Sequence, residues 1–346
     1  MSFAEGAKRA LSIACLALGL PWAVLGCKEK AAPAGGALGG NEPSVLRYQA
    51  SPGAVIAPEL AEDLGFLAPL RLQFVSSTTS GPQSIQAVAT NDTDFGGAFN
   101  GAVLKLVAAK APIRAVVSLY GVDAETWNGF YVAEDSPIRS ARDLIGKKVA
   151  MNTLGAHHEF VLKEYLSRAG LSAPQIAQVM LVAIPPANGE QALRQHQTDV
   201  TVLGGIFRDR ALERGGLRLL FSDHDLFGAF TAGSYVMRSD FIAQHSKTVA
   251  TFVAGVGKAL EWARSTPREQ VIERFRAIIA KRQRNEDASL LKYWQGFGIE
   301  TKGGVIQRSD FQLWIDWMVR AGDLHPGQLE PSRVYTNQFN PFAPAG

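Results

Sequence analysis

Short apolar segments rich in β-branched residues alternate with amphipathic segments over residues 45–238. The short segments predict strands, and they read VLRYQA, LRLQFV, DFGGAF, IRAVVSLY, NGFYVAE, KKVAMN, VMLVAI, TDVTVL, LRLLFS and GSYVMR. Between them, apolar positions recur at helical spacing and predict helices over 56–64, 82–90, 101–109, 156–169, 190–197 and 207–214. This alternation is typical of a parallel or mixed sheet covered by helices, so we expect an α/β fold.

The pattern changes towards the C-terminus, where helical periodicity dominates. After the strand GSYVMR, we expect amphipathic helices over 241–265, 267–280, 287–296 and 310–319. Four tryptophans recur on these helices at spacings that suit one buried face, and they are Trp262, Trp294, Trp314 and Trp317. We assign them to packing rather than to a cofactor site.

The length and charge of the chain limit its organisation and its partners. With 346 residues the chain is long for one core, so we expect two lobes. The formal net charge of +3 is spread along the sequence, without the Lys/Arg blocks or interleaved aromatic residues of a nucleic-acid groove. We therefore expect no nucleic-acid partner.

The N-terminus has the features of an export signal. Lys8 and Arg9 precede an apolar run over residues 10–25, which is too short for a comfortable membrane span. The run ends in VLGC, which resembles the bacterial lipobox, in which the Cys becomes the lipidated first residue of the mature chain. We expect a lipoprotein signal peptide over residues 1–26 and lipidation at Cys27; the alternative is a secretory signal cut elsewhere, with Cys27 incidental.

The two cysteines and the segment that follows the signal agree with an exported protein that is lipid-anchored to a bacterial membrane. Cys15 would leave with the signal, so Cys27 would be the single thiol and no disulfide could form. Residues 27–43 are rich in Ala, Gly and Pro, and predict a flexible tether with a reach on the order of 20 Å. The folded body would therefore stand on the periplasmic or cell-surface side, near the membrane.

The segment TTSGP precedes the helix expected over 82–90 and carries more hydroxyl groups than one cap requires. Ser80 or Thr79 before Pro82 could simply accept a free amide at the helix start. Alternatively, the surplus hydroxyl of Thr78 and the close approach that Gly81 permits would allow an anion to bind at this helix N-terminus. Both interpretations remain open at this point.

A longer segment carries a family resemblance. Residues 131–171 read YVAEDSPIRSARDLIGKKVAMNTLGAHHEFVLKEYLSRAGL, which resembles the solute-binding proteins of ABC importers in the nitrate, sulfonate and taurine class. The stretches APELAEDLGF, SIQAVATNDTDFG, QALRQHQTDVTVL and YTNQFN agree with it, so the resemblance covers most of residues 46–340. The final helical region matches only in its general layout.

This resemblance implies the type II periplasmic-binding-protein fold, in which two α/β lobes are joined by two crossover segments, with a helical C-terminal region. Lobe one would comprise 44–129 and 237–346, and lobe two 130–236. The crossings would fall near 127–132 and 233–238, with Gly129 and Gly233 as hinge points.

In this fold the ligand would lie between the lobes, beyond the carboxyl ends of the strands. The helix starts TTSGP and NTLGAHH would face each other there, an arrangement that suits an anion. Asn100 could cap the helix that follows it or face the cleft. The expected ligand-binding residues are Gln49, Ser51, Thr78, Thr79, Ser80, Gly81, Asn100, Trp127, Thr153, Gly155 and His157.

The adjacent His157 and His158 do not predict a metal site. Neighbours on a helix diverge by about 100°, unlike an i, i+4 pair. One of the two could contact the ligand, or both could be capped or solvated. We expect no metal and no cofactor.

Carrier, enzyme and sensor functions are compatible with this fold to different degrees. Thiamine-pyrimidine synthases resemble these binding proteins, but they use an iron-binding cysteine cluster that this sequence lacks. The sequence has no Gly-x-Ser-x-Gly, P-loop or His-Glu-x-x-His motif. We expect no enzyme, but a monomeric binding lipoprotein that delivers a small anion to an ABC permease. A thiamine-pyrimidine-related protein and a ligand sensor for a membrane kinase remain alternatives.

Overall fold

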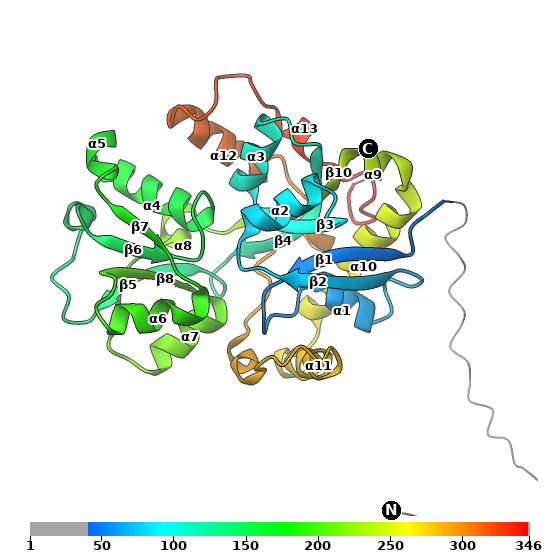
Figure 1. Cartoon of the computed structure of the whole chain (residues 1–346), viewed down its shortest axis with the longest axis horizontal. Helices are drawn as coiled ribbons and strands as arrows, with labels where there is room; N and C mark the ends of the chain where they lie inside the picture. The colour runs from blue at the N-terminus through cyan, green and yellow to red at the C-terminus, as the bar shows by residue number, and fades with distance from the viewer. Residues whose placement is uncertain (1–40, 345–346) are drawn as a thin grey trace, which may run out of the picture. The chain divides into compact units, whose positions relative to one another are not determined.

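The computed structural model describes residues 41–344, which contain strands β1–β10 and helices α1–α13 (Figure 1). The expected signal peptide, Cys27 and most of the tether lie outside the described residues. Within residues 41–344, no helix is both long and apolar enough to cross a membrane. The α/β fold class expected from the sequence is confirmed.

Two small sheets and the helices on them form what we call the first lobe. Strand β1 (Val45–Ala50) pairs in parallel with β2 (Arg71–Ser77). Strand β10 (Phe230–Arg238) lies between β3 (Phe95–Phe99) and β4 (Ile113–Val122), antiparallel to both. The helices of this lobe are α1 (Ala57–Asp63), α2 (Gly81–Ala89), α3 (Asn100–Ala108), α9 (Ser239–Gln244), α10 (Ser246–Ser265), α11 (Arg268–Lys281), α12 (Ser309–Arg320) and α13 (Pro331–Val334).

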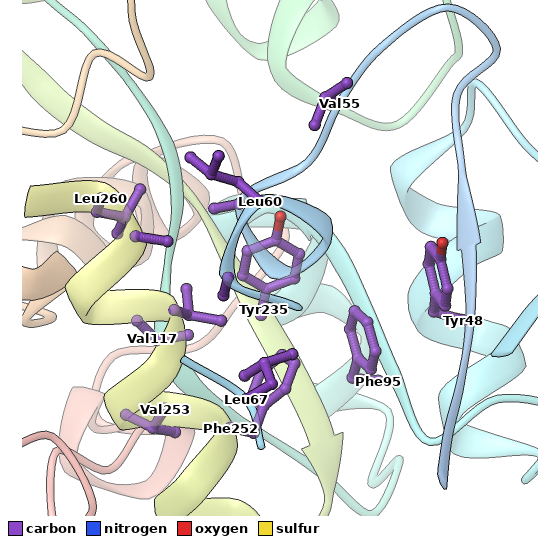
Figure 2. Close-up of a cluster of buried hydrophobic side chains, with 14 of the residues drawn as sticks. Tyr48, Val55, Leu60, Leu67, Phe95, Val117, Tyr235, Phe252, Val253 and Leu260 are labelled. Carbon is purple, nitrogen blue, oxygen red and sulfur yellow. The ribbon is translucent and has the colours of Figure 1, made fainter. Parts of the chain in front are cut away.

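Aromatic side chains hold the core of the first lobe together. Phe95 of β3 stacks on Tyr48 of β1, with 5.4 Å between ring centroids, and also contacts Phe252 of α10. Figure 2 shows Phe95 between these two rings, close to Tyr235 of β10. The same cluster therefore joins both sheets of the lobe to α10.

One five-stranded sheet forms the second lobe, in the order β7–β6–β8–β5–β9. These strands are β5 (Asn128–Ala133), β6 (Lys148–Met151), β7 (Met180–Ala183), β8 (Val200–Gly204) and β9 (Leu217–Ser222). β6 runs parallel to β7 and β8, whereas β5 is antiparallel to β8 and β9. The accompanying helices are α4 (His157–Arg168), α5 (Ala173–Ile176), α6 (Pro186–Arg194), α7 (Gly205–Glu213) and α8 (Asp223–Phe227), with the 3-10 turn η1 (Ala141–Leu144).

The chain passes between the lobes at 123–127 and again at 228–229, between α8 and β10. The second crossing comes earlier than the sequence suggested, because all of β10 pairs with strands of the first lobe. Gly129 and Gly233 lie inside paired strands rather than in the connections. A Cβ at Gly233 would lie 2.3 Å from the Tyr120 ring, which gives this glycine a packing role.

Two expected helices of the C-terminal region differ from the structure. The helix expected over 241–265 is divided into α9 and α10 at His245, whose φ and ψ of −126° and 50° are not helical. The expected helix over 287–296 contains only the 3-10 turn η2 (Ser289–Tyr293), followed by a segment without helix or strand. The Arg268 guanidinium donates hydrogen bonds to the carbonyls of Lys292 and Trp294, which ties this segment to α11.

Candidate functional site

A cavity of about 420 Å³ lies between the two lobes. Residues of the first lobe, the second lobe and the first crossing contribute to its wall. Among them are Gly81, Gly97, Phe99, Tyr120, Trp127, Asn128, Asn152, Thr153, His157, His158, Thr201, Gly204, Phe207 and Phe297. No Lys, Arg, Asp or Glu is among the described residues that line the cavity.

Two helices begin at the edge of this cavity, one from each lobe. α2 follows β2 through TTSGP, and α4 follows β6 through NTLGAHH. Ser80 caps α2, because its Oγ accepts a hydrogen bond from the Gln83 amide at 3.4 Å. The first amides of the two helices, those of Gly81 and His157, have no hydrogen-bond partner within residues 41–344. Free amides at a helix start are suited to binding a negatively charged group.

The two helix starts contact each other directly across the cleft. The hydroxyl oxygens of Ser80 and Thr153 are 3.1 Å apart. Beside them, Asn152 Nδ2 donates a hydrogen bond to the Thr79 carbonyl at 3.1 Å. The structure therefore brings together the two segments that the sequence singled out.

The imidazole of His157 forms part of the buried wall. His157 is 5% exposed, and its ring stacks on Phe99 with 5.0 Å between centroids. Its Nδ1 is 3.3 Å from the Tyr120 hydroxyl. Burial lowers the pKa of His157 well below its ordinary value, and lowers the pKa of His158 to about 4. Both imidazoles are therefore neutral at physiological pH.

A buried carboxylate, which sequence reasoning missed, lies behind His157. Asp223 Oδ1 accepts hydrogen bonds from the amides of Asn128 and His224, and its Oδ2 accepts one from Asn128 Nδ2 at 2.7 Å. His157 Nε2 is 3.3 Å from Asp223 Oδ2, without the alignment of a hydrogen bond. Burial raises the pKa of Asp223 to about 6, although the hydrogen bonds from Asn128 act in the opposite direction. In the sequence this residue looks like part of a helix start, SDHD, so no local signal marks it.

Trp127 is held in place from behind. The Arg208 guanidinium lies 4.2 Å from the centre of the indole and donates a hydrogen bond to the Trp127 carbonyl at 3.1 Å. Arg208 also binds the Glu125 carbonyl and forms an ion pair with Asp209. This arrangement fixes the indole as one wall of the cavity.

Some buried polar atoms in the wall lack a partner among the described residues. Thr201 is 1% exposed, and its hydroxyl makes no hydrogen bond. The same is true of His158 Nδ1. Because buried polar groups are normally paired, these atoms indicate a place for a ligand or for water.

The structure separates the expected ligand-binding residues into two groups. Gly81, Trp127, Thr153 and His157 line the cavity, and Ser80 contacts Thr153 at its edge. The remaining residues do not line the cavity: Gln49 binds Ser76, Ser51 binds the Thr78 carbonyl, Thr78 binds Gln83, Thr79 binds Asn152 through its carbonyl, and the Gly155 amide binds Glu159.

Asn100 neither caps α3 nor faces the cleft. The residue at the cap position is Phe99, and Asn100 is fully buried. Its Nδ2 donates to the carbonyls of Thr231 and Asp310, and its Oδ1 accepts from Ser234. These hydrogen bonds tie α3 to β10 and α12, which corrects the sequence-based expectation.

The geometry does not include a recognisable metal centre. Within residues 41–344, no three His, Cys, Asp or Glu side chains are grouped so that they could hold a metal ion. His157 and Asp223 are close together, but hydrogen bonds from Asn128 and His224 already engage the carboxylate.

Comparisons with known proteins agree with a binding-protein architecture. The family described as NMT1/THI5 like matches residues 60–270. The putative aliphatic sulfonates-binding protein of Escherichia coli (strain K12) is 28% identical over 204 residues, which cover 58% of this chain and 59% of the relative. The match thus spans less than two thirds of that relative's length.

Solved structures show the same fold over a larger part of the chain. The alkanesulfonate-binding protein SsuA from Xanthomonas axonopodis pv. citri, bound to MOPS, has a TM-score of 0.65 at 19% identity, covering 86% of this chain and 99% of that one. The periplasmic nitrate-binding protein NrtA from Synechocystis PCC 6803 has a TM-score of 0.66 at 15% identity, covering 86% and 88%. This chain therefore belongs to the NMT1/THI5-like family and has the fold of periplasmic binding proteins.

Proposed function

We propose that this protein is an exported solute-binding protein that captures a small anion of the sulfonate class between its lobes and performs no chemistry on it. The observation that carries this proposal is the 3.1 Å contact between Ser80 and Thr153, which joins the starts of α2 and α4 at the edge of the cavity. Relatives named as sulfonate- and nitrate-binding proteins support it.

Neutral groups would hold the anion. The free amides of Gly81 and His157, with the hydroxyls of Ser80 and Thr153, would bind the acid group, and Trp127 would contact the rest of the ligand. Each helix start contributes about 0.3–2 kcal/mol. Micromolar affinity requires about 8 kcal/mol, so hydrogen bonds and apolar burial on closure of the lobes would supply the remainder.

Delivery would proceed as a monomer to an ABC permease, from a membrane to which a lipid on Cys27 anchors the protein. The VLGC sequence and the periplasmic relatives support this part of the proposal. Mass spectrometry of the mature chain tests the anchor: a diacylglyceryl group on Cys27 is expected, and an unmodified Cys27 would contradict it.

Isothermal titration calorimetry on residues 27–346 carrying Cys27→Ser tests the binding function. The titrants are alkanesulfonates, nitrate and a neutral pyrimidine. We expect a sulfonate to bind, and the double variant Ser80→Ala/Thr153→Val to weaken it about tenfold or more, since it loses two hydrogen bonds to a charged group. Ser172→Ala removes an exposed serine before α5, outside the cavity, and is the matched control. Binding of the pyrimidine alone would overturn the proposal.

A further inference from the structure

The cavity has room for a tail as well as an acid group. Its volume of about 420 Å³ falls within the range of about 300–1,000 Å³ that holds organic ligands, and nitrate would fill little of it. Besides Phe99 and Tyr120 of the first lobe, its aromatic lining includes Trp127 from the first crossing, Phe207 from α7, and Phe297 from the segment after η2. The wall that contains the polar helix starts therefore also offers flat apolar surfaces.

The described lining of the cavity offers no carboxylate to pair with a positively charged group on the ligand. No Asp or Glu side chain is among its described lining residues. The carboxylate behind His157, that of Asp223, is fully buried and already accepts hydrogen bonds from Asn128 and His224. Enclosing an ammonium group without a carboxylate or another strong acceptor is costly.

The indole of Trp127 also disfavours a cation. A cation is attracted to the electron-rich face of an aromatic ring, but the Arg208 guanidinium already lies 4.2 Å from the centre of this one. A second positive charge against the same ring would be repelled by the guanidinium. A neutral aromatic ring would instead stack on the indole or meet it edge to face.

We propose that the ligand is an organic monoanion with a flat, apolar and uncharged tail, such as an arenesulfonate, and that the site rejects zwitterionic sulfonates. This inference rests on the proposed function and deepens it. The acid group would lie at the starts of α2 and α4, and the tail would lie against Trp127, Phe207 and Phe297.

Three sulfonates with the same acid group separate the effect of a positive charge on affinity from the effect of an aromatic ring. Taurine and 1-propanesulfonate have nearly the same shape and differ by an ammonium in place of a methyl group, whereas p-toluenesulfonate adds an aromatic ring. In calorimetric titrations of residues 27–346 carrying Cys27→Ser, we expect 1-propanesulfonate to bind about tenfold more tightly than taurine. We expect p-toluenesulfonate to bind about tenfold more tightly still.

Substitutions in the wall test where the tail lies. Trp127→Leu should weaken p-toluenesulfonate about tenfold and change 1-propanesulfonate by less than about threefold. Phe207→Leu should also weaken p-toluenesulfonate more than 1-propanesulfonate. This second variant keeps the test possible if Trp127→Leu does not fold. Trp262→Leu replaces a half-buried tryptophan of α10 outside the cavity and should change neither affinity.

The outcomes distinguish this inference from the function on which it rests. Taurine binding as tightly as 1-propanesulfonate, or p-toluenesulfonate binding no more tightly than 1-propanesulfonate, would overturn the inference and leave sulfonate binding intact. It would also be overturned if Trp127→Leu and Phe207→Leu lost the same factor of affinity for p-toluenesulfonate as for 1-propanesulfonate. Binding of none of the three sulfonates would overturn both.

Discussion

The buried carboxyl of Asp223 should make the stability of the protein depend on pH in an unusual direction. Asp223 is fully buried beside neutral His157, and burial raises its pKa to about 6, from an ordinary value of 3.8. The perturbation is Asp223→Asn, which keeps the shape of the side chain. Its retained oxygen can still accept the hydrogen bonds from the amides of Asn128 and His224.

Proton linkage sets the direction in which stability changes with pH. Because the folded state binds the proton more tightly than the unfolded state, Asp223 contributes stability that is fully present below pH 3.8 and is lost as the pH rises through about 6. A shift of this size corresponds to about 3 kcal/mol at 1.36 kcal/mol per pH unit. In Asp223→Asn, the new amide faces Asn128 Nδ2, two donors together, which costs about 1 kcal/mol.

The variant should therefore be less stable than the parent by about 1 kcal/mol near pH 4, and more stable by about 2 kcal/mol near pH 8. Urea unfolding of both proteins at each pH measures the two differences. The control is Asp287→Asn, an exposed carboxyl whose pKa is lowered below 3.8 by hydrogen bonds from Ser289, so its difference from the parent should be nearly the same at pH 4 and pH 8. A difference for Asp223→Asn that stays constant between the two pH values would refute the reasoning.

Three further substitutions have defined outcomes. Asn100→Ala leaves the carbonyls of Thr231 and Asp310 without their donor, so it should lower the free energy of unfolding by about 3 kcal/mol while ligand affinity, measured by calorimetry, is unchanged. Gly121→Ala would place a Cβ 1.9 Å from the Gly298 carbonyl oxygen, and should cost about 1–3 kcal/mol in chemical unfolding. Burial raises the pKa of Asp310 to about 7, so Asp310→Asn should gain thermal stability relative to the parent as the pH rises from about 4 to 8, and a constant difference would contradict this.

The regular elements were predictable because their signals are local. Each expected strand from VLRYQA to GSYVMR is present, since β-branched runs between turn residues mark strands in the sequence itself. The break at His245 and the irregular segment after η2 were not predictable in this way. In the second segment, Arg268 reaches the Lys292 and Trp294 carbonyls from another helix, a contact that only the tertiary structure shows.

The site was predictable where it is built from helix starts. The hydroxyl and glycine residues before α2 and α4 are visible in the sequence, and the structure brings Ser80 and Thr153 together. Asn100 has the same sequence character, yet its partners on β10 and α12 are more than a hundred residues away. Asp223 is likewise defined by Asn128, which is distant in sequence, so only the tertiary structure shows its environment.

The central claim is that the starts of α2 and α4, from different lobes, hold one anion in the cavity between them. A crystal structure of the mature chain with p-toluenesulfonate or 1-propanesulfonate tests it most directly. The account predicts sulfonate oxygens at about 2.7–3.2 Å from the Gly81 amide and the Thr153 hydroxyl. A sulfonate bound elsewhere, or with its oxygens turned towards Phe297 and away from both helix starts, would contradict it.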